Sequence, residues 1–220
     1  DMVSQALSPF DAAMAGFKTA GVQDVVLDLR YNGGGLVSVA DKLASYPAGP
    51  TTSGSTFASL LYNDHKQGYN QTFRFQSYAN ATGLNRVYVL TGPRTCSASE
   101  QVINALRPFV TVVTIGDTTC GKPVGFNPTG DGCGTTYSVV TFESVNAQRQ
   151  GRYFDGLAAT CDAAEDFTVA QDGSADPLLA TAMQYADTGV CPASCRADGD
   201  CNPCATPGDP GNYCCISGLC

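Results

Sequence analysis

The chain has 220 residues and a net charge of −8, with only 12 lysines and arginines, and these are scattered. Scattered basic residues form no stripe that could follow a phosphate backbone, so the sequence excludes nucleic acid as a partner. Apolar residues make up 43% of the chain, which predicts a globular protein. No apolar run approaches the roughly 20 residues that a membrane-spanning helix needs.

The first part of the chain is predicted to alternate between helices and a buried strand. Apolar residues at helical spacing predict a helix over 4–19, which Gly21 ends. A buried strand follows over 25–29, then a glycine turn at 32–35. A second helix is predicted over 36–45, closed by Pro47 and Gly49.

The rest of the chain continues this alternation after a polar stretch over 50–85, which holds one strand-like run at 72–75. The elements predicted beyond it are a core strand over 86–91, a helix over 98–106, a strand over 111–115, an outer strand over 135–143 and a closing helix over 177–186. Recurring strand, helix and strand predict an α/β fold, with a parallel or mixed sheet and covering helices.

The eleven cysteines divide the chain. Four lie in the body, and seven lie in the last 30 residues. This density predicts two units, a core over 1–189 and a small disulfide-rich tail over 190–220, in an oxidising compartment. Zinc is the alternative, since the spacing from Cys201 to Cys204 is ligand-like, but a second matching pair and histidines are missing. We expect no metal and no cofactor. An odd count leaves at least one thiol unpaired within the chain.

Three segments could carry chemistry. Asn32 to Gly35 sit where a strand ends and a helix begins, so the backbone N–H groups of Gly33 and Gly34 could hold an oxyanion. A tight turn that needs positive φ is the alternative. Ser97 opens Ser-Ala-Ser-Glu before an apolar helix, which is either a capping box or a nucleophile in the positive potential of a helix N-terminus.

The third segment contains Lys122. The run from Gly116 to Pro123 matches the phosphate-binding pattern G-x-x-x-x-G-K-[ST] at every position but the last. There Pro123 replaces the residue whose hydroxyl would bind magnesium. The only histidine, His65, lies in a polar loop and is predicted to be a solvated surface residue. A lysine can replace histidine as the base where desolvation lowers its pKa, and Lys122 has apolar neighbours. A Ser97/Lys122 dyad is therefore the simplest catalytic hypothesis.

These motifs together resemble the C-terminal processing peptidases, which include the tail-specific proteases. The matching runs, which span roughly residues 5–185, are Asp-Leu-Arg-Tyr-Asn-Gly-Gly-Gly at 28–35, Thr-Cys-Ser-Ala-Ser-Glu at 95–100 and Thr-Cys-Gly-Lys at 119–122. The resemblance implies a ClpP/crotonase-like fold. It also implies a secreted serine endopeptidase that cleaves proteins near their C-termini, with Ser97 as nucleophile and Lys122 as base. A non-catalytic ligand- or peptide-binding protein on the same fold is the alternative.

The sequence departs from the family pattern in three ways. Many members orient the lysine with an Asp 11 residues after the serine or a Gln four after the lysine, and this chain has Pro108 and Phe126 there. No PDZ-like domain precedes the core. The strand expected before the first helix is also missing, so we expect an N-terminal fragment of the same precursor to pair with this chain as a second polypeptide.

Further expectations follow from the resemblance. The N–H of Ala98 and that of Gly33 or Gly34 should form the oxyanion hole. If Ser97 and Lys122 meet, Cys96 and Cys120 lie close enough to bond and brace the site. Cys133 and Cys161 should then pair with each other, and the tail should hold about three bridges of its own.

Overall fold

The computed structural model describes residues 1–171 and 173–192, and its centre is a parallel sheet. Four strands, β1 (Val25–Asp28), β4 (Arg86–Thr91), β5 (Thr111–Gly116) and β10 (Cys161–Asp162), pair in the order β1-β4-β5-β10. All three pairings are parallel. The three core strands predicted from buried apolar runs are confirmed.

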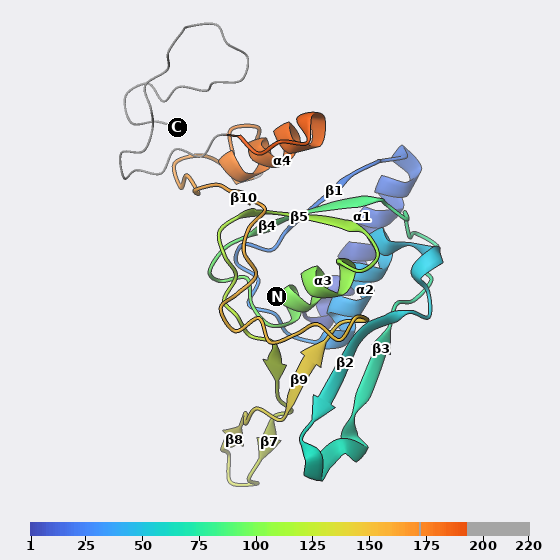
Figure 1. Ribbon diagram of the computed structural model, residues 1–220, viewed down its shortest axis with the longest axis vertical. Helices are drawn as coiled ribbons and strands as arrows, with labels where there is room; N and C mark the ends of the chain where they lie inside the picture. The colour runs from blue at the N-terminus through green and yellow to red at the C-terminus, as the bar shows by residue number, and fades with distance from the viewer. Residues whose placement is uncertain (172, 193–220) are drawn as a thin grey trace, which may run out of the picture.

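Helices cover both faces of this sheet (Figure 1). The helices α2 (Val37–Ala48) and α3 (Ala98–Leu106) pack on one face, and α4 (Pro177–Thr188) packs on the other. Such a sandwich requires strands that are apolar on both sides. The mixed α/β class expected from the order of the elements is confirmed.

The side chains of β4 show how the strand serves both layers. Val87 and Val89 join the core cluster that holds α2 and α3, whereas Tyr88 and Leu90 join the cluster that holds α4. Successive side chains of a strand point to opposite faces, so a run of apolar residues buries every position.

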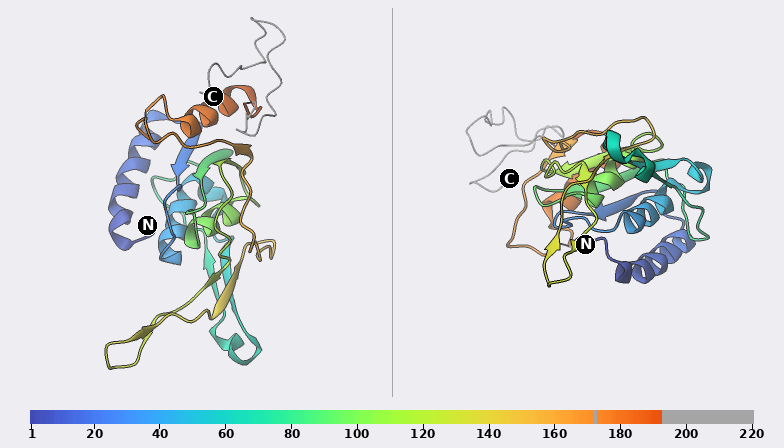
Figure 2. Two further views of the ribbon diagram at one scale, coloured as in Figure 1. Left: turned by 90° about the vertical axis from the view of Figure 1, so that its left-hand side faces the viewer. Right: turned by 90° about the horizontal axis from the view of Figure 1, so that it is seen from below.

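The helix α1 (Leu7–Ala20) lies on the outside, against α2 (Figure 2), after the short 3-10 turn η1 (Ser4–Ala6). Gly21 ends it in the left-handed conformation, with φ of 65°. Before the helix, Met2 forms a parallel bridge with Gly35 and is fully buried. The N-terminal residues therefore pair with the glycine turn, while β1 remains an edge strand of the sheet as described.

A second, antiparallel sheet is formed by β2 (Thr56–Tyr62), β3 (Gln71–Arg74), β6 (Val124–Gly125) and β9 (Phe142–Val145), in the order β3-β2-β9-β6. The β2–β3 hairpin and a small hairpin of β7 (Thr129–Gly130) with β8 (Thr136–Tyr137) project from the end of the molecule opposite α4 (Figures 1 and 2). The short turns η2 (Pro50–Thr52) and η3 (Asp64–Tyr69) complete the described elements.

Three predicted elements are wrong in detail. The polar stretch 50–85 contains β2, which was not predicted; its buried residues Phe57, Ala58 and Leu60 do not alternate strictly with exposed ones. The single outer strand predicted over 135–143 is two strands, because β8 pairs with β7 whereas β9 pairs with β2. Pro47 does not end α2 but lies in its last turn, where a missing N–H breaks one hydrogen bond only.

The predicted pairing of Cys133 with Cys161 is also wrong. Cys161, in β10, bonds to Cys191, just beyond α4, with their Cα atoms 5.4 Å apart. Cys133 is exposed and unpaired among the described residues, because it lies in the loop of the projecting β7–β8 hairpin. The remaining tail cysteines and their predicted bridges lie outside the described residues. Among the described helices, none has the length and apolar character needed to cross a membrane.

Candidate active site

The three segments that could carry chemistry follow three neighbouring parallel strands. The glycine turn follows β1, Ser97 follows β4, and Lys122 follows β5. Since the sheet order is β1-β4-β5 and all strands run the same way, their carboxyl ends meet at one edge. Segments up to 90 residues apart in the chain are thereby brought together, with Ser97 in the middle.

Backbone hydrogen bonds join these three segments directly. The Cys96 N–H donates to the Asn32 carbonyl at 3.1 Å, and the Ser99 hydroxyl donates to the same oxygen at 2.9 Å. On the other side, the Cys120 N–H donates to the Thr95 carbonyl at 3.0 Å. The serine segment is therefore fixed from both sides.

The Glu100 side chain joins the serine and lysine segments by hydrogen bonds to both. It is fully buried. Its Oε2 accepts hydrogen bonds from the backbone N–H groups of Ser97 and Lys122, each at 2.8 Å, and its Oε1 accepts from Gly121 N–H at 2.8 Å and from the Thr119 hydroxyl at 2.5 Å. In the sequence Glu100 is recognisable only as the last residue of the Ser-Ala-Ser-Glu capping box. The bonds to Gly121 and Lys122 were not predicted, because nothing local in the sequence indicates them.

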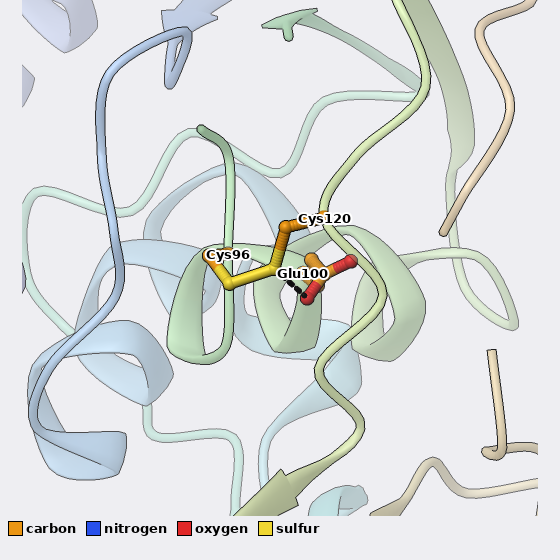
Figure 3. A group of neighbouring side chains, drawn as sticks. All are labelled: Cys96, Glu100 and Cys120. Carbon is orange, nitrogen blue, oxygen red and sulfur yellow. Dashed lines mark hydrogen bonds between the residues drawn. A yellow bond between two sulfur atoms is a disulfide. The ribbon is translucent and has the colours of Figure 1, made fainter. Parts of the chain in front are cut away.

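A disulfide closes the same junction. Cys96 bonds to Cys120, with Cα atoms 5.2 Å apart, and this predicted pairing is confirmed. Figure 3 shows the bond lying beside the Glu100 carboxylate. The ligand atoms of Cys96, Glu100 and Cys120 lie within 4.8 Å of one another, but both sulfurs are used in the disulfide and offer no thiolate to a metal.

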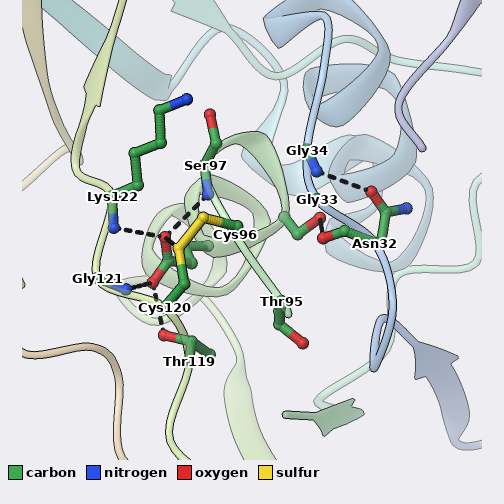
Figure 4. Close-up of a disulfide and its surroundings, with 12 residues drawn as sticks. Asn32, Gly33, Gly34, Thr95, Cys96, Ser97, Thr119, Cys120, Gly121 and Lys122 are labelled. Carbon is green, nitrogen blue, oxygen red and sulfur yellow. Dashed lines mark hydrogen bonds between the residues drawn. A yellow bond between two sulfur atoms is a disulfide. The ribbon is translucent and has the colours of Figure 1, made fainter. Parts of the chain in front are cut away.

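Ser97 has an unusual backbone. Its φ of 58° and ψ of −118° make it one of three non-glycine residues with positive φ among those described. Such conformations cost about 1–3 kcal/mol and are held only where surrounding contacts fix them. Here the contacts are the Glu100 and Asn32 hydrogen bonds. The strain turns the Ser97 side chain out of the helix start, and Figure 4 shows its hydroxyl and the Lys122 side chain extending to the same side of the disulfide.

Lys122 is half-buried, and its Nζ lies 4.7 Å from the centre of the Phe126 ring. Among the described residues Nζ forms no ion pair. An extended strand, β6, follows Lys122, so the helix of a phosphate-binding loop does not form there. His65 is 88% exposed, as expected for a surface residue.

The glycine turn packs directly on the serine segment. A Cβ placed on Gly34 would lie 2.8 Å from both the Ala98 nitrogen and the Ser97 Cβ. The N–H of Gly34 donates to Asn32 Oδ1 and the N–H of Gly33 donates to Asp1 Oδ1, each at 3.1 Å. The Ala98 N–H makes no hydrogen bond with the part of the chain described here. The structure thus packs Gly34 against Ser97 and Ala98, and it places a carboxylate at Gly33 that was not predicted.

A cavity of about 620 Å³ lies at this junction. Ser97, Lys122, Gly33 and Gly34 lie in its wall together with Gln101, on α3. The remaining side chains are mostly apolar and come from the antiparallel sheet and its loops: Leu60, Tyr62, Phe73, Val124, Phe126 and Phe142. A mostly apolar cavity with a few convergent polar groups is the usual form of a ligand or active site.

Comparison with known proteins gives the family. The sequence profile of peptidase family S41 matches residues 2–156, which include the glycine turn, Ser97 and Lys122. The chain belongs to peptidase family S41. No curated protein sequence matches the chain significantly.

Solved structures agree with this family membership. A protein from Bacteroides fragilis, named as a candidate S41 protease, is 30% identical with a TM-score of 0.78, covering 83% of this chain and 49% of its own. The S41 chain described here therefore spans about half the length of that relative. The photosystem II D1 C-terminal processing protease has the same fold, with 22% identity and a TM-score of 0.57 over 72% of this chain and 39% of its own.

Proposed function

We propose that this S41 chain is a secreted serine endopeptidase in which Ser97 attacks the scissile carbonyl and Lys122 acts as general base. The observation that carries the proposal is the junction at Glu100, where one carboxylate oxygen binds the backbone N–H groups of Ser97 and Lys122 at 2.8 Å each. Because both side chains also line one cavity, an amine on Lys122 could take the proton of the Ser97 hydroxyl.

The oxyanion would lie between the glycine turn and the start of α3. The unpartnered N–H of Ala98 is one donor, and Gly33 or Gly34 supplies the second. Gly33 N–H serves only after the Asp1 carboxylate leaves it, so substrate and Asp1 compete for this donor. Of the three donors, only the Ala98 N–H is free among the described residues and needs no reorganisation when the charge develops, because Gly34 N–H is held by Asn32 Oδ1 as Gly33 N–H is by Asp1.

Cleavage near substrate C-termini is the specificity that the family resemblance supports. The two disulfides in the described residues support an oxidising compartment, outside the cell or in a periplasm. The expected second chain from an N-terminal fragment has no support from the structure or the comparisons and is not part of the proposal.

A fluorophosphonate probe, which reacts with activated serines, tests the proposal directly. We expect the native chain to be labelled once, at Ser97, and Ser97→Ala and Lys122→Ala to remain unlabelled and inactive on peptides. Ser97→Ala should change the free energy of unfolding by no more than about 1 kcal/mol, the typical value of a lost helix cap. Undiminished peptide cleavage by purified Ser97→Ala would remove Ser97 from the mechanism. No labelling and no cleavage by the folded native chain would favour the non-catalytic binding protein.

A further inference from the structure

The residue that orients Lys122 is not at either position where the family resemblance places it, since Pro108 and Phe126 occupy them. The face of the Phe126 ring lies 4.7 Å from the Lys122 Nζ, and such a cation–π contact attracts the amine without fixing the direction of one N–H bond. A general base needs a fixed orientation, because a misplacement of about 1 Å can lower a rate by about 100-fold. The chain should therefore contain another acceptor for Nζ.

Gln101 has an unsatisfied acceptor in the same cavity. Its side chain is 7% exposed, and it makes no hydrogen bond with any described residue. Its Oε1 is buried and has no partner. Buried polar atoms without partners are rare and costly, and each needs an explanation. Gln101 lines the cavity together with Ser97 and Lys122, and within residues 1–171 and 173–192 neither its Oε1 nor the Lys122 amine has a hydrogen-bond partner.

Gln101 lies in the first turn of α3, four residues after Ser97. Its backbone N–H donates to the Ser97 carbonyl at 3.0 Å, which joins the two residues at the start of the helix. Glu100 meanwhile holds the Lys122 backbone against the neighbouring residue of the same helix. The backbones of Ser97, Gln101 and Lys122 are therefore held together at the start of α3.

We propose that Gln101 is the positioning residue for Lys122, accepting a hydrogen bond from Nζ while the Nζ lone pair faces the Ser97 hydroxyl. The inference rests on the proposed function of the Ser97/Lys122 pair. It assigns to the start of α3 both the nucleophile and the group that orients its base. The contact requires the Gln101 carboxamide to turn toward the cavity, because its Oε1 is buried in the structure.

The charges already present around Lys122 determine whether a charge introduced at position 101 can be detected. The other titratable groups in the cavity wall are Asp1 and Tyr62. Glu100 lies behind the Lys122 peptide, where four donors already hold it, and Glu143 on β9 is paired with Arg152 at 3.2 Å. A carboxylate introduced at position 101 would therefore be a new charge next to Nζ and would favour the protonated amine.

Two substitutions at Gln101 separate positioning from packing. Gln101→Met keeps the length of the side chain and removes the acceptor, so kcat should fall roughly 10- to 100-fold with KM changed less than about threefold. Gln101→Glu keeps an acceptor and adds a charge, so the acid limb of the kcat profile should move up by about one pH unit. Above that limb Gln101→Glu should recover most of its activity, whereas Gln101→Met should not recover at any pH.

Gln71→Glu is the matched control, because Gln71 lines the same cavity from β3. Gln71→Glu should move the acid limb of the kcat profile less than a third as far as Gln101→Glu does, whatever its effect on KM. Equal shifts in the two variants, or a kcat of Gln101→Met within twofold of the native value, would overturn the positioning role. If Gln101→Met does not fold, the comparison of the two glutamate variants decides alone. Failure of the proposed function gives a different result, namely activity in Ser97→Ala.

Discussion

Replacing Glu100 by glutamine removes one oxygen from the centre of the active site and puts an amide NH₂ in its place. If the remaining oxygen keeps Gly121 and Thr119, the new NH₂ faces the N–H groups of Ser97 and Lys122, which both need an acceptor at 2.8 Å. Both donors are then buried without a partner. The change is nearly isosteric, so its effect reports hydrogen bonding and charge rather than volume.

The magnitude follows from the number of donors affected. Each buried donor without an acceptor costs about 1–3 kcal/mol, so two should cost about 4 kcal/mol. In a domain of this size that corresponds to a melting midpoint lower by about 8–16 °C. Since the same donors fix the serine and lysine backbones relative to each other, the folded fraction should also lose at least about 100-fold in fluorophosphonate labelling rate.

Glu143→Gln is the control, because the Glu143 side chain forms one ion pair, with an Arg152 side chain that is 75% exposed. Such a pair contributes about 1 kcal/mol or less. Urea unfolding at neutral pH gives both free energies, and labelling is measured at a temperature where both variants are folded. An unfolding free energy for Glu100→Gln within 1 kcal/mol of the control, with undiminished labelling, would refute the role assigned to this carboxylate.

Three further substitutions test the surroundings of the site. Gly34→Ala should abolish labelling, because Gly34 has φ of +97° and an added Cβ would lie 2.7 Å from the Cys96 carbonyl oxygen; labelling at the native rate would contradict this. Burial raises the pKa of Asp41 to about 6, so the folded state binds this proton more tightly than the unfolded chain. That stabilisation is present below about pH 4 and is lost as the pH rises through about 6. Asp41→Asn should remove up to about 3 kcal/mol of this pH dependence, measured by urea unfolding at pH 4.5 and 7.5, and an unchanged slope would contradict it. Removing the disulfide with Cys96→Ala and Cys120→Ala together should cost about 3 kcal/mol, since it closes a loop with a sequence separation of 24; equal midpoints with and without the bond in urea would contradict that value.

Local sequence patterns determined the elements that build the sheet. The apolar runs at 86–91 and 111–115 predicted β4 and β5, because a strand covered on both faces must be apolar at every position. The helix α3 was predicted with its observed bounds, because an apolar periodicity and a capping pattern coincide there. The spacing of Ser97 and Lys122 also pointed to the family. Strand β2 was missed because its apolar side chains are separated by small and polar ones within a polar stretch.

The tertiary structure alone decided which distant groups meet. The pairing of Cys161 with Cys191 depends on α4 returning across the sheet to β10, which no local spacing encodes. Three of the four hydrogen bonds that Glu100 accepts come from a loop about 20 residues away, which follows β5 at the same sheet edge. In the sequence Gln101 is one of several polar residues in α3, and only the structure shows that it lines the cavity and that its Oε1 has no partner within the described part of the chain. Hydrogen bonds and disulfides act over a few ångströms in space, so the chain order fixes their partners only through the completed fold.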